Sequence, residues 1–183
     1  KALLAAAGYN AQKPLSFKVM ISNSGSGQMV PLPMNEVLQR NLKQACGVEV
    51  KFDVVEWQVL SSAGRLGSDN PGLHGAMAVN ASSASTDIGM MVRYFAAANF
   101  SPAGNNFAQW KDDQFEAAMD TAAKATDNAT IQASFRAAHQ RLVDNPPWLY
   151  IVHDLNPRAL NKKVQGLVSA QSWLIDLTLI SLH

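Results

Sequence analysis

The sequence contains a single cysteine, Cys46, in 183 residues. One thiol excludes an internal disulfide and any metal site built from several cysteines. No two histidines have the four-residue helical spacing of a metal-binding pair; they stand at His74, His139, His153 and His183. We therefore expect no metal ion and no cofactor.

An excess of charge of one sign is also lacking. The 15 lysines and arginines nearly cancel the 14 acidic residues, and they are scattered along the chain. Without a basic block, nucleic acid is not an expected partner. No run approaches the roughly 18 apolar residues of a membrane span, and Lys1 to Gly8 lacks the regions of a signal peptide. A chain that begins on Lys1 within a helical pattern is expected to be a fragment.

No group of residues has a pattern typical of catalysis. A side-chain nucleophile needs a base within hydrogen-bond reach and a third group that orients the base. No histidine has a recognisable spacing with Ser, Cys or a carboxylate, and the neighbours His153 and Asp154 would point to opposite faces of a strand. Asp112, Asp113 and Glu116 fit the first turn of a helix, where the dipole favours negative charge. We do not expect an enzyme.

Apolar periodicity predicts an α/β unit in the first third of the chain. Apolar residues alternate from Leu15 to Ile21 and again from Val48 to Glu56, as in two strands. Between them, Met34, Leu38 and Leu42 recur at helical spacing, and Gly47 follows as a stop signal. Two strands joined through a helix are expected to lie parallel.

Further elements follow along the chain. We predict a helix near Gln58 to Arg65, a third, buried strand at Gly75 to Val79, and a helical hairpin divided at Asp127 or Asn128. Trp148 to Val152 is a strand candidate, and short strands and turns are expected near Gly166.

Three polar loops are candidate ligand sites. Ser22 to Gly27 lies between a strand and a helix, where amide groups at the helix start can hold a polar ligand group. It is not a nucleotide fingerprint, because the third glycine position is Val30. Asn80 to Thr86 is too polar for burial, and Asn105 to Trp110 adds paired amides and an aromatic ring. A plain connection for the first loop, and core packing for Trp110, are the alternative interpretations.

The order of these elements and several local phrases resemble the carboxy-terminal part of the family 5 extracellular solute-binding proteins, the dipeptide, oligopeptide and nickel-binding group. Each phrase alone is degenerate, and the specificity lies in their order. The phrases are Lys1 to Tyr9, Gly47 to Val50 with Glu56-Trp57, Asn106 to Phe115, Ala125 to Asp127, Pro147 with Ile151 and His153, and Val164 to Gly166.

The resemblance implies the C-terminal lobe of a periplasmic-binding-protein type II fold, α/β with a mixed sheet flanked by helices. Residues 1–146 would form the second lobe, and residues 147–183 would cross back toward a missing first lobe. The expected function is the extracytoplasmic substrate-binding component of an ABC importer, which binds a small-molecule or short-peptide solute by lobe closure. The expected partners are the importer's membrane subunits, and the full-length protein is expected to be a monomer. The expected location is the periplasm, or a lipid anchor on the cell surface of a Gram-positive host.

One departure from the family bears on the solute. In the peptide-binding members, the loop after the third strand resembles Trp-x-x-Asp, and its carboxylate binds the peptide's amino terminus. This chain has Asn80 and no tryptophan there. A neutral amide does not form the charge-assisted bond that an ammonium favours. The predicted ligand-binding residues are hydrogen-bonding groups and one stacking ring: Ser24, Asn80, Ser82, Asn106 and Trp110.

Two other functions stay open at this point. A ligand-sensing domain of a cytoplasmic regulator would use the same lobe type beside a DNA-binding module. An α/β enzyme domain would need catalytic groups supplied by sequence outside this chain.

Overall fold

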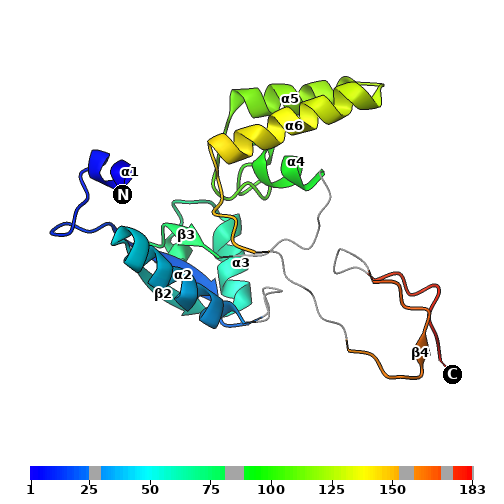
Figure 1. Ribbon diagram of the computed structural model, residues 1–183, viewed down its shortest axis with the longest axis horizontal. Coiled ribbons are helices and arrows are strands. Elements are labelled where there is room, and N and C mark those ends of the chain that lie inside the picture. Colours follow the sequence, from blue (N-terminus) through cyan, green and yellow to red (C-terminus); the bar gives the residue numbers. More distant parts are fainter. Residues whose placement is uncertain (25–29, 81–88, 153–158, 170–174, 183) are drawn as a thin grey trace. The chain divides into compact units, whose positions relative to one another are not determined.

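The computed structural model describes residues 1–24, 30–80, 89–152, 159–169 and 175–182 (Figure 1). The chain forms two compact units: Lys1–Ser82 with Tyr94–Lys111, and Ser83–Arg93 with Asp112–His183. The predicted division between a lobe of residues 1–146 and a crossing segment of residues 147–183 stays a prediction.

The first unit is built around a three-stranded parallel sheet of order β2-β1-β3. β1 (Ser16–Ser22) pairs with β2 (Glu49–Val55) along its whole length and with the short β3 (Ala78–Val79) at Val19 and Met20. The α/β fold and the parallel pairing predicted from the alternating pattern are confirmed.

The helices of this unit begin and end where the sequence signals stand. α1 spans Ala2–Ala6, and α2 spans Pro31–Cys46, with a proline at its first position. Gly47 ends α2 with φ of 74°, a left-handed conformation that glycine adopts without strain. α3 spans Trp57–Arg65 after the N-cap residue Glu56, and short 3-10 turns cover Pro71–Leu73 (η1) and Ala97–Asn99 (η2).

Sheet topology places α2 and α3 on opposite faces. α2 joins β1 to β2, and the connection through α3 runs back past β1 to β3. Because parallel crossovers are right-handed, two crossovers that run in opposite directions cover opposite faces. The core lies on the α3 face, where Met20, 0% exposed, packs with Leu60 and Ala63.

The second unit contains a helical hairpin formed by α5 (Asp113–Lys124) and α6 (Asn128–Asp144), which lie side by side (Figure 1). Both predicted helices are confirmed. The Asp127 carboxylate accepts a hydrogen bond from the Thr130 N–H at 2.8 Å and so caps α6. The remaining helix, α4 (Gly89–Phe95), spans the boundary between the two units.

A small antiparallel ribbon follows near the end of the chain. β4 (Val164–Gln165) pairs with β5 (Ser181–Leu182), as expected for short strands near Gly166. Gly166 has φ of 80°, and a Cβ there would lie 1.9 Å from the carbonyl oxygen of Leu179. Only glycine fits this turn.

Two strand predictions need correction. Trp148 to Val152 forms no strand: its five side chains are exposed, and no described strand pairs with it. A strand needs a partner for its backbone groups, and the periodicity of one segment does not reveal whether a partner exists. β3 is a strand but is not buried, because Ala78 is exposed and Val79 half-buried at the edge of the sheet.

Asp112 does more than complement a helix dipole. Its carboxylate accepts hydrogen bonds from the N–H groups of Gln114 and Phe115 at 3.0 Å, and it lies 2.8 Å from the Arg141 guanidinium of α6. The Arg141 hydrogen bond, opposed by burial and helped by the Phe115 N–H, lowers the pKa of Asp112 to about 2. The pair therefore ties the start of α5 to the end of α6.

We predict that Asp112→Ala lowers the free energy of unfolding by about 3 kcal/mol at pH 7, because it removes both the cap and the partner of Arg141. Asp112→Asn should cost less, since asparagine is also a good cap. A carboxyl group with a lowered native pKa stabilises the fold above its unfolded pKa, and this contribution is lost as pH falls from about 4 to about 2. The gap between wild type and Asp112→Asn in urea denaturation should shrink over that range. A constant gap would contradict the assignment.

Candidate functional site

The carboxyl ends of the three parallel strands meet at one edge of the sheet. Asn23 and Ser24 follow β1, Glu56 follows β2, and Asn80 follows β3. Backbone pairing extends into this edge, because the Asn23 N–H donates to the Val55 carbonyl at 2.9 Å and the Asn80 N–H to the Met20 carbonyl at 2.9 Å. The first residues beyond β1 and β3 are therefore held by the sheet itself.

The strand order changes direction at β1. The helix that follows β1, α2, and the helix that precedes β3, α3, cover opposite faces of the sheet. In open α/β sheets, ligands bind in the crevice beyond the carboxyl ends of the strands at such a point, between β1 and β3 for a 2-1-3 order. The structure thus brings Ser24 and Asn80, both predicted site residues, to the same edge.

The local chemistry of this edge is polar and mostly neutral. The Ser24 hydroxyl donates to the Asn23 side-chain oxygen at 3.3 Å. The Glu56 carboxylate accepts the Gln58 N–H at 2.7 Å and caps α3. The Ser22 side chain is buried, and its hydroxyl has no hydrogen-bond partner in the described part of the chain. Ser22 lies on the same face as Met20, toward α3, because side chains alternate along a strand.

Asn106 does not lie open to a ligand, which corrects the sequence-based prediction. It is 0% exposed, and its side-chain amide donates to the carbonyls of Phe95, Ala96 and Trp110 at 3.1, 3.3 and 2.8 Å. Its side-chain oxygen accepts the Trp110 N–H at 3.1 Å. A polar residue in a loop was expected to face the cleft, but its hydrogen-bonding groups are used to order the loop's own backbone.

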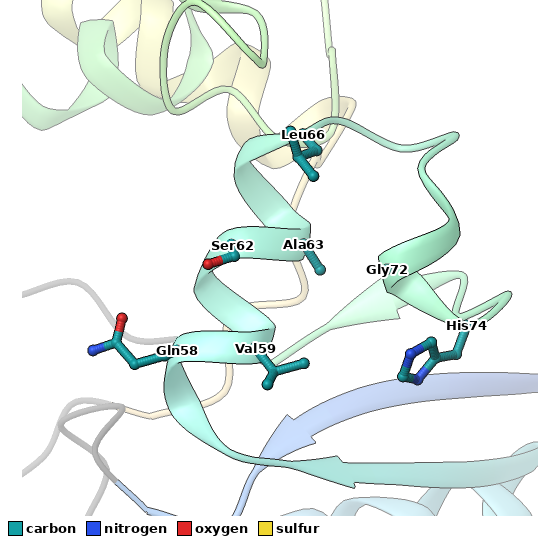
Figure 2. A pocket seen from close by; sticks show the side chains of 7 residues that line it. All are labelled: Gln58, Val59, Ser62, Ala63, Leu66, Gly72 and His74. Atoms are coloured by element: carbon teal, nitrogen blue, oxygen red, sulfur yellow. The ribbon is translucent and has the colours of Figure 1, made fainter.

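The loop that contains Asn106 packs on the last turn of α3. Ser101 Oγ lies 3.4 Å from the Gly64 carbonyl oxygen, and the Phe107 ring would lie 3.3 Å from a Cβ on Gly64. Gly64 is seven residues beyond Trp57, so roughly 10 Å of helix separates this contact from the start of α3 at the sheet edge. Figure 2 shows Gln58 near one end of α3 and Leu66 at the other. The structure therefore does not bring Asn106 and Trp110 together with Ser24 and Asn80.

The two other predicted site residues have different outcomes. The half-buried Trp110 packs edge-on against Phe95, with ring centroids 6.1 Å apart, so its side chain belongs at least in part to the packing of this loop. A stacking role for Trp110 stays a prediction. Ser82 lies outside the described residues.

A groove on the α3 face was not foreseen from the sequence. It has a volume of about 390 Å³ and lies between α3 and the turn at η1 (Figure 2). His74 borders it, with Nδ1 2.8 Å from the Asp53 carboxylate of β2, and Lys18 Nζ donates to the His74 carbonyl at 2.6 Å. The contact between Asp53 on a strand and His74 in a turn, 21 positions apart, could not be predicted from a local sequence pattern. The lining residues are Gln58, Val59, Ser62, Ala63, Leu66, Gly72 and His74.

Metal ligands do not converge in the part of the chain that the structure describes. No group of three or more His, Cys, Asp or Glu side chains there lies close enough to hold a metal ion. Among the same residues, no helix is long and apolar enough to cross a membrane.

Comparison with known proteins gives relatives of much greater length. No family model matches the sequence. Di/tripeptide-binding protein 2 of Pseudomonas aeruginosa (strain UCBPP-PA14) is 25% identical over 166 residues, which are 91% of this chain and 30% of that protein. HbpA2 from Haemophilus parasuis matches the whole chain with a TM-score of 0.67 and 23% identity, over 34% of its own length. The dipeptide-binding protein of Pseudoalteromonas sp. SM9913, solved with Met-Leu, matches with a TM-score of 0.67 and 18% identity, also over 34% of its length.

These matches identify the fold as that of the C-terminal lobe of periplasmic-binding-protein type II proteins. The chain spans about a third of the length of the relatives it matches. The sequence match along nine-tenths of the chain makes it similar to a di/tripeptide-binding protein, in agreement with the resemblance to the family 5 extracellular solute-binding proteins.

We predict that Asn106→Ala destabilises the intact protein by about 3 kcal/mol, because it leaves a buried N–H and three carbonyls without their side-chain partner. Asn105→Ala, at the half-buried neighbouring position, is the matched control and should cost well under 1 kcal/mol. Urea denaturation measures both. Equal stability of the two variants would return Asn106 to the list of ligand-contacting candidates.

Proposed function

We propose that this chain is the second lobe of the substrate-binding component of an ABC importer, which takes up peptides, peptide-like compounds or other small polar solutes. The protein would work outside the cytoplasm, in the periplasm or on a lipid anchor at the surface of a Gram-positive cell. It would act as a monomer, deliver its solute to the importer's membrane subunits, and perform no catalysis. Nucleic acid would not be a partner.

The observation that carries this proposal is the structural match over the whole chain with a dipeptide-binding protein solved with Met-Leu. The sequence match with a di/tripeptide-binding protein supports the same function independently. Both relatives are about three times as long as this chain, which leaves room for a first lobe.

The chemistry of the sheet edge supports binding rather than catalysis. Among the described residues, the hydroxyl and amide groups beyond β1 and β3 can orient a solute by hydrogen bonds, whereas a serine nucleophile would need an adjacent base to activate it. A small solute in a protein site has most of its surface covered, which one sheet edge does not achieve. Closure of a first lobe over this edge would complete the site and favour the closed form when solute is bound.

The exposed segment Trp148 to Val152 also supports a two-lobed protein. Five consecutive apolar side chains are exposed here, and the centroids of the Trp148 and Tyr150 rings lie 6.2 Å apart. Exposed apolar patches mark surfaces that another part of a protein covers. A segment that crosses toward a first lobe would be covered in this way.

A thermal-shift screen of the intact protein that contains this chain tests the proposal. The panel comprises short peptides, N-acetylated peptides, oligosaccharides, opine-type conjugates and nickel. A true solute at 100 times its dissociation constant stabilises the protein by roughly 2.7 kcal/mol and raises its melting temperature. The absence of any shift, in a protein that unfolds cooperatively, would favour a sensing domain over a solute receptor.

Ser24 offers a local test of the sheet edge. With a solute found in the screen, Ser24→Ala should weaken binding about fivefold, the effect of one lost hydrogen bond. Ser68→Ala removes the same hydroxyl from an exposed turn before η1 and should leave the affinity unchanged. Isothermal titration measures both variants. If both bind like the wild type, the solute does not contact the end of β1.

A further inference from the structure

The described residues at the sheet edge carry almost no charge. The residues at and just beyond the carboxyl ends of the three strands, in the described part of the chain, are 22–24, 56–58 and 79–80. Only Glu56 among them is ionisable, and no lysine, arginine or histidine is present in these ranges. A solute that binds beyond the carboxyl ends of β1 and β3 would therefore meet the hydroxyl and amide groups of these residues.

The single carboxylate is already engaged. Glu56 accepts the Gln58 N–H at 2.7 Å and lies at the N-terminus of α3, where the helix dipole partly compensates its negative charge. An ammonium group that recruited Glu56 would compete with this cap. Among the described residues at this edge, no other carboxylate is present to pair with a cation.

Neutral hydrogen-bonding capacity is present at the same edge. The Ser24 hydroxyl and the Asn80 amide each both donate and accept hydrogen bonds, so they can match a carbonyl, an amide or a hydroxyl. The Ser22 hydroxyl is 1% exposed and lies on the α3 side of β1, so it is not part of this exposed capacity.

The cost of desolvation differs between neutral and charged groups of a solute. In a closed cleft, a neutral polar group whose hydrogen bonds are satisfied is buried at little cost, whereas an ammonium group without a paired carboxylate loses its hydration without compensation. We propose that the part of the solute bound at this edge is uncharged, an amide, carbonyl or hydroxyl rather than a free ammonium. N-blocked peptides and neutral oligosaccharides belong to this class. The proposal rests on the proposed function, and it refers to the same site.

Matched ligand pairs that differ in one charge provide the test, on the intact protein. The first pair is trialanine and N-acetyltrialanine, and the second is the trimer of glucosamine and the trimer of N-acetylglucosamine. Titration calorimetry measures each affinity for the wild type, Asn80→Asp and Glu56→Gln. Asn41→Asp, which makes the same charge change at an exposed position of α2, is the matched control.

The wild type should bind the acetylated member of at least one pair at least as tightly as the free amine. Asn80→Asp should shift the ratio of affinities toward the amine by about tenfold, because it supplies a carboxylate for a charge-assisted hydrogen bond. Glu56→Gln and Asn41→Asp should leave the ratio unchanged.

Other outcomes separate the two proposals. A wild type that binds the free amine tenfold more tightly, or an Asn80→Asp variant with an unchanged ratio, would overturn the neutral-edge inference and leave the solute-receptor function intact. A preference for the amine that disappears in Glu56→Gln would assign Glu56 as the counter-charge and also overturn it. No binding of any panel member, here or in the wider screen, would overturn both.

Discussion

Parallel, in-register pairing of β1 with β2 is the constraint on which the first unit depends. Each residue from Ser16 to Ser22 pairs with a residue from Glu49 to Val55. A slip of one residue would move the buried Met20 and Ile21 to the wrong faces, so their burial fixes the register. The same register brings Asn23 and Glu56 to one edge and, through the pairing of β1 with β3, adds Asn80 to it.

Most of the secondary structure could be predicted from the sequence because its signals are local. Alternation, helical spacing, the stop at Gly47 and the cap at Asp127 each lie within the element that they define. Trp148 to Val152 was predicted wrongly for the same reason: alternation tells which residues suit a strand, but strand formation needs a partner elsewhere in the chain. The burial of β3 depends in the same way on neighbours that its own sequence does not encode.

The candidate site was predictable only in part. Ser24 and Asn80 follow parallel strands, and the rule for carboxyl ends places them together without knowledge of packing. Asn106 is a polar loop residue of a type that often contacts ligands. Its four hydrogen bonds to backbone groups depend on a loop conformation that the sequence does not specify. Phe107 contacts Gly64, and this contact holds the loop at the far end of α3. A contact between residues so far apart in the sequence could not be predicted from local patterns.

Preorganisation explains how a short polar edge can contribute to tight binding. The hydrogen bonds from Asn23 to Val55 and from Asn80 to Met20 continue the sheet one residue beyond its strands, and the cap at Glu56 fixes the start of α3. Backbone that is already ordered loses little conformational entropy when a solute arrives, so more of each hydrogen bond appears as affinity. Rigidity matters further for a neutral edge, because amide and hydroxyl groups select solutes through the direction of their hydrogen bonds. That direction is well defined only when the backbone that carries these groups is held in place.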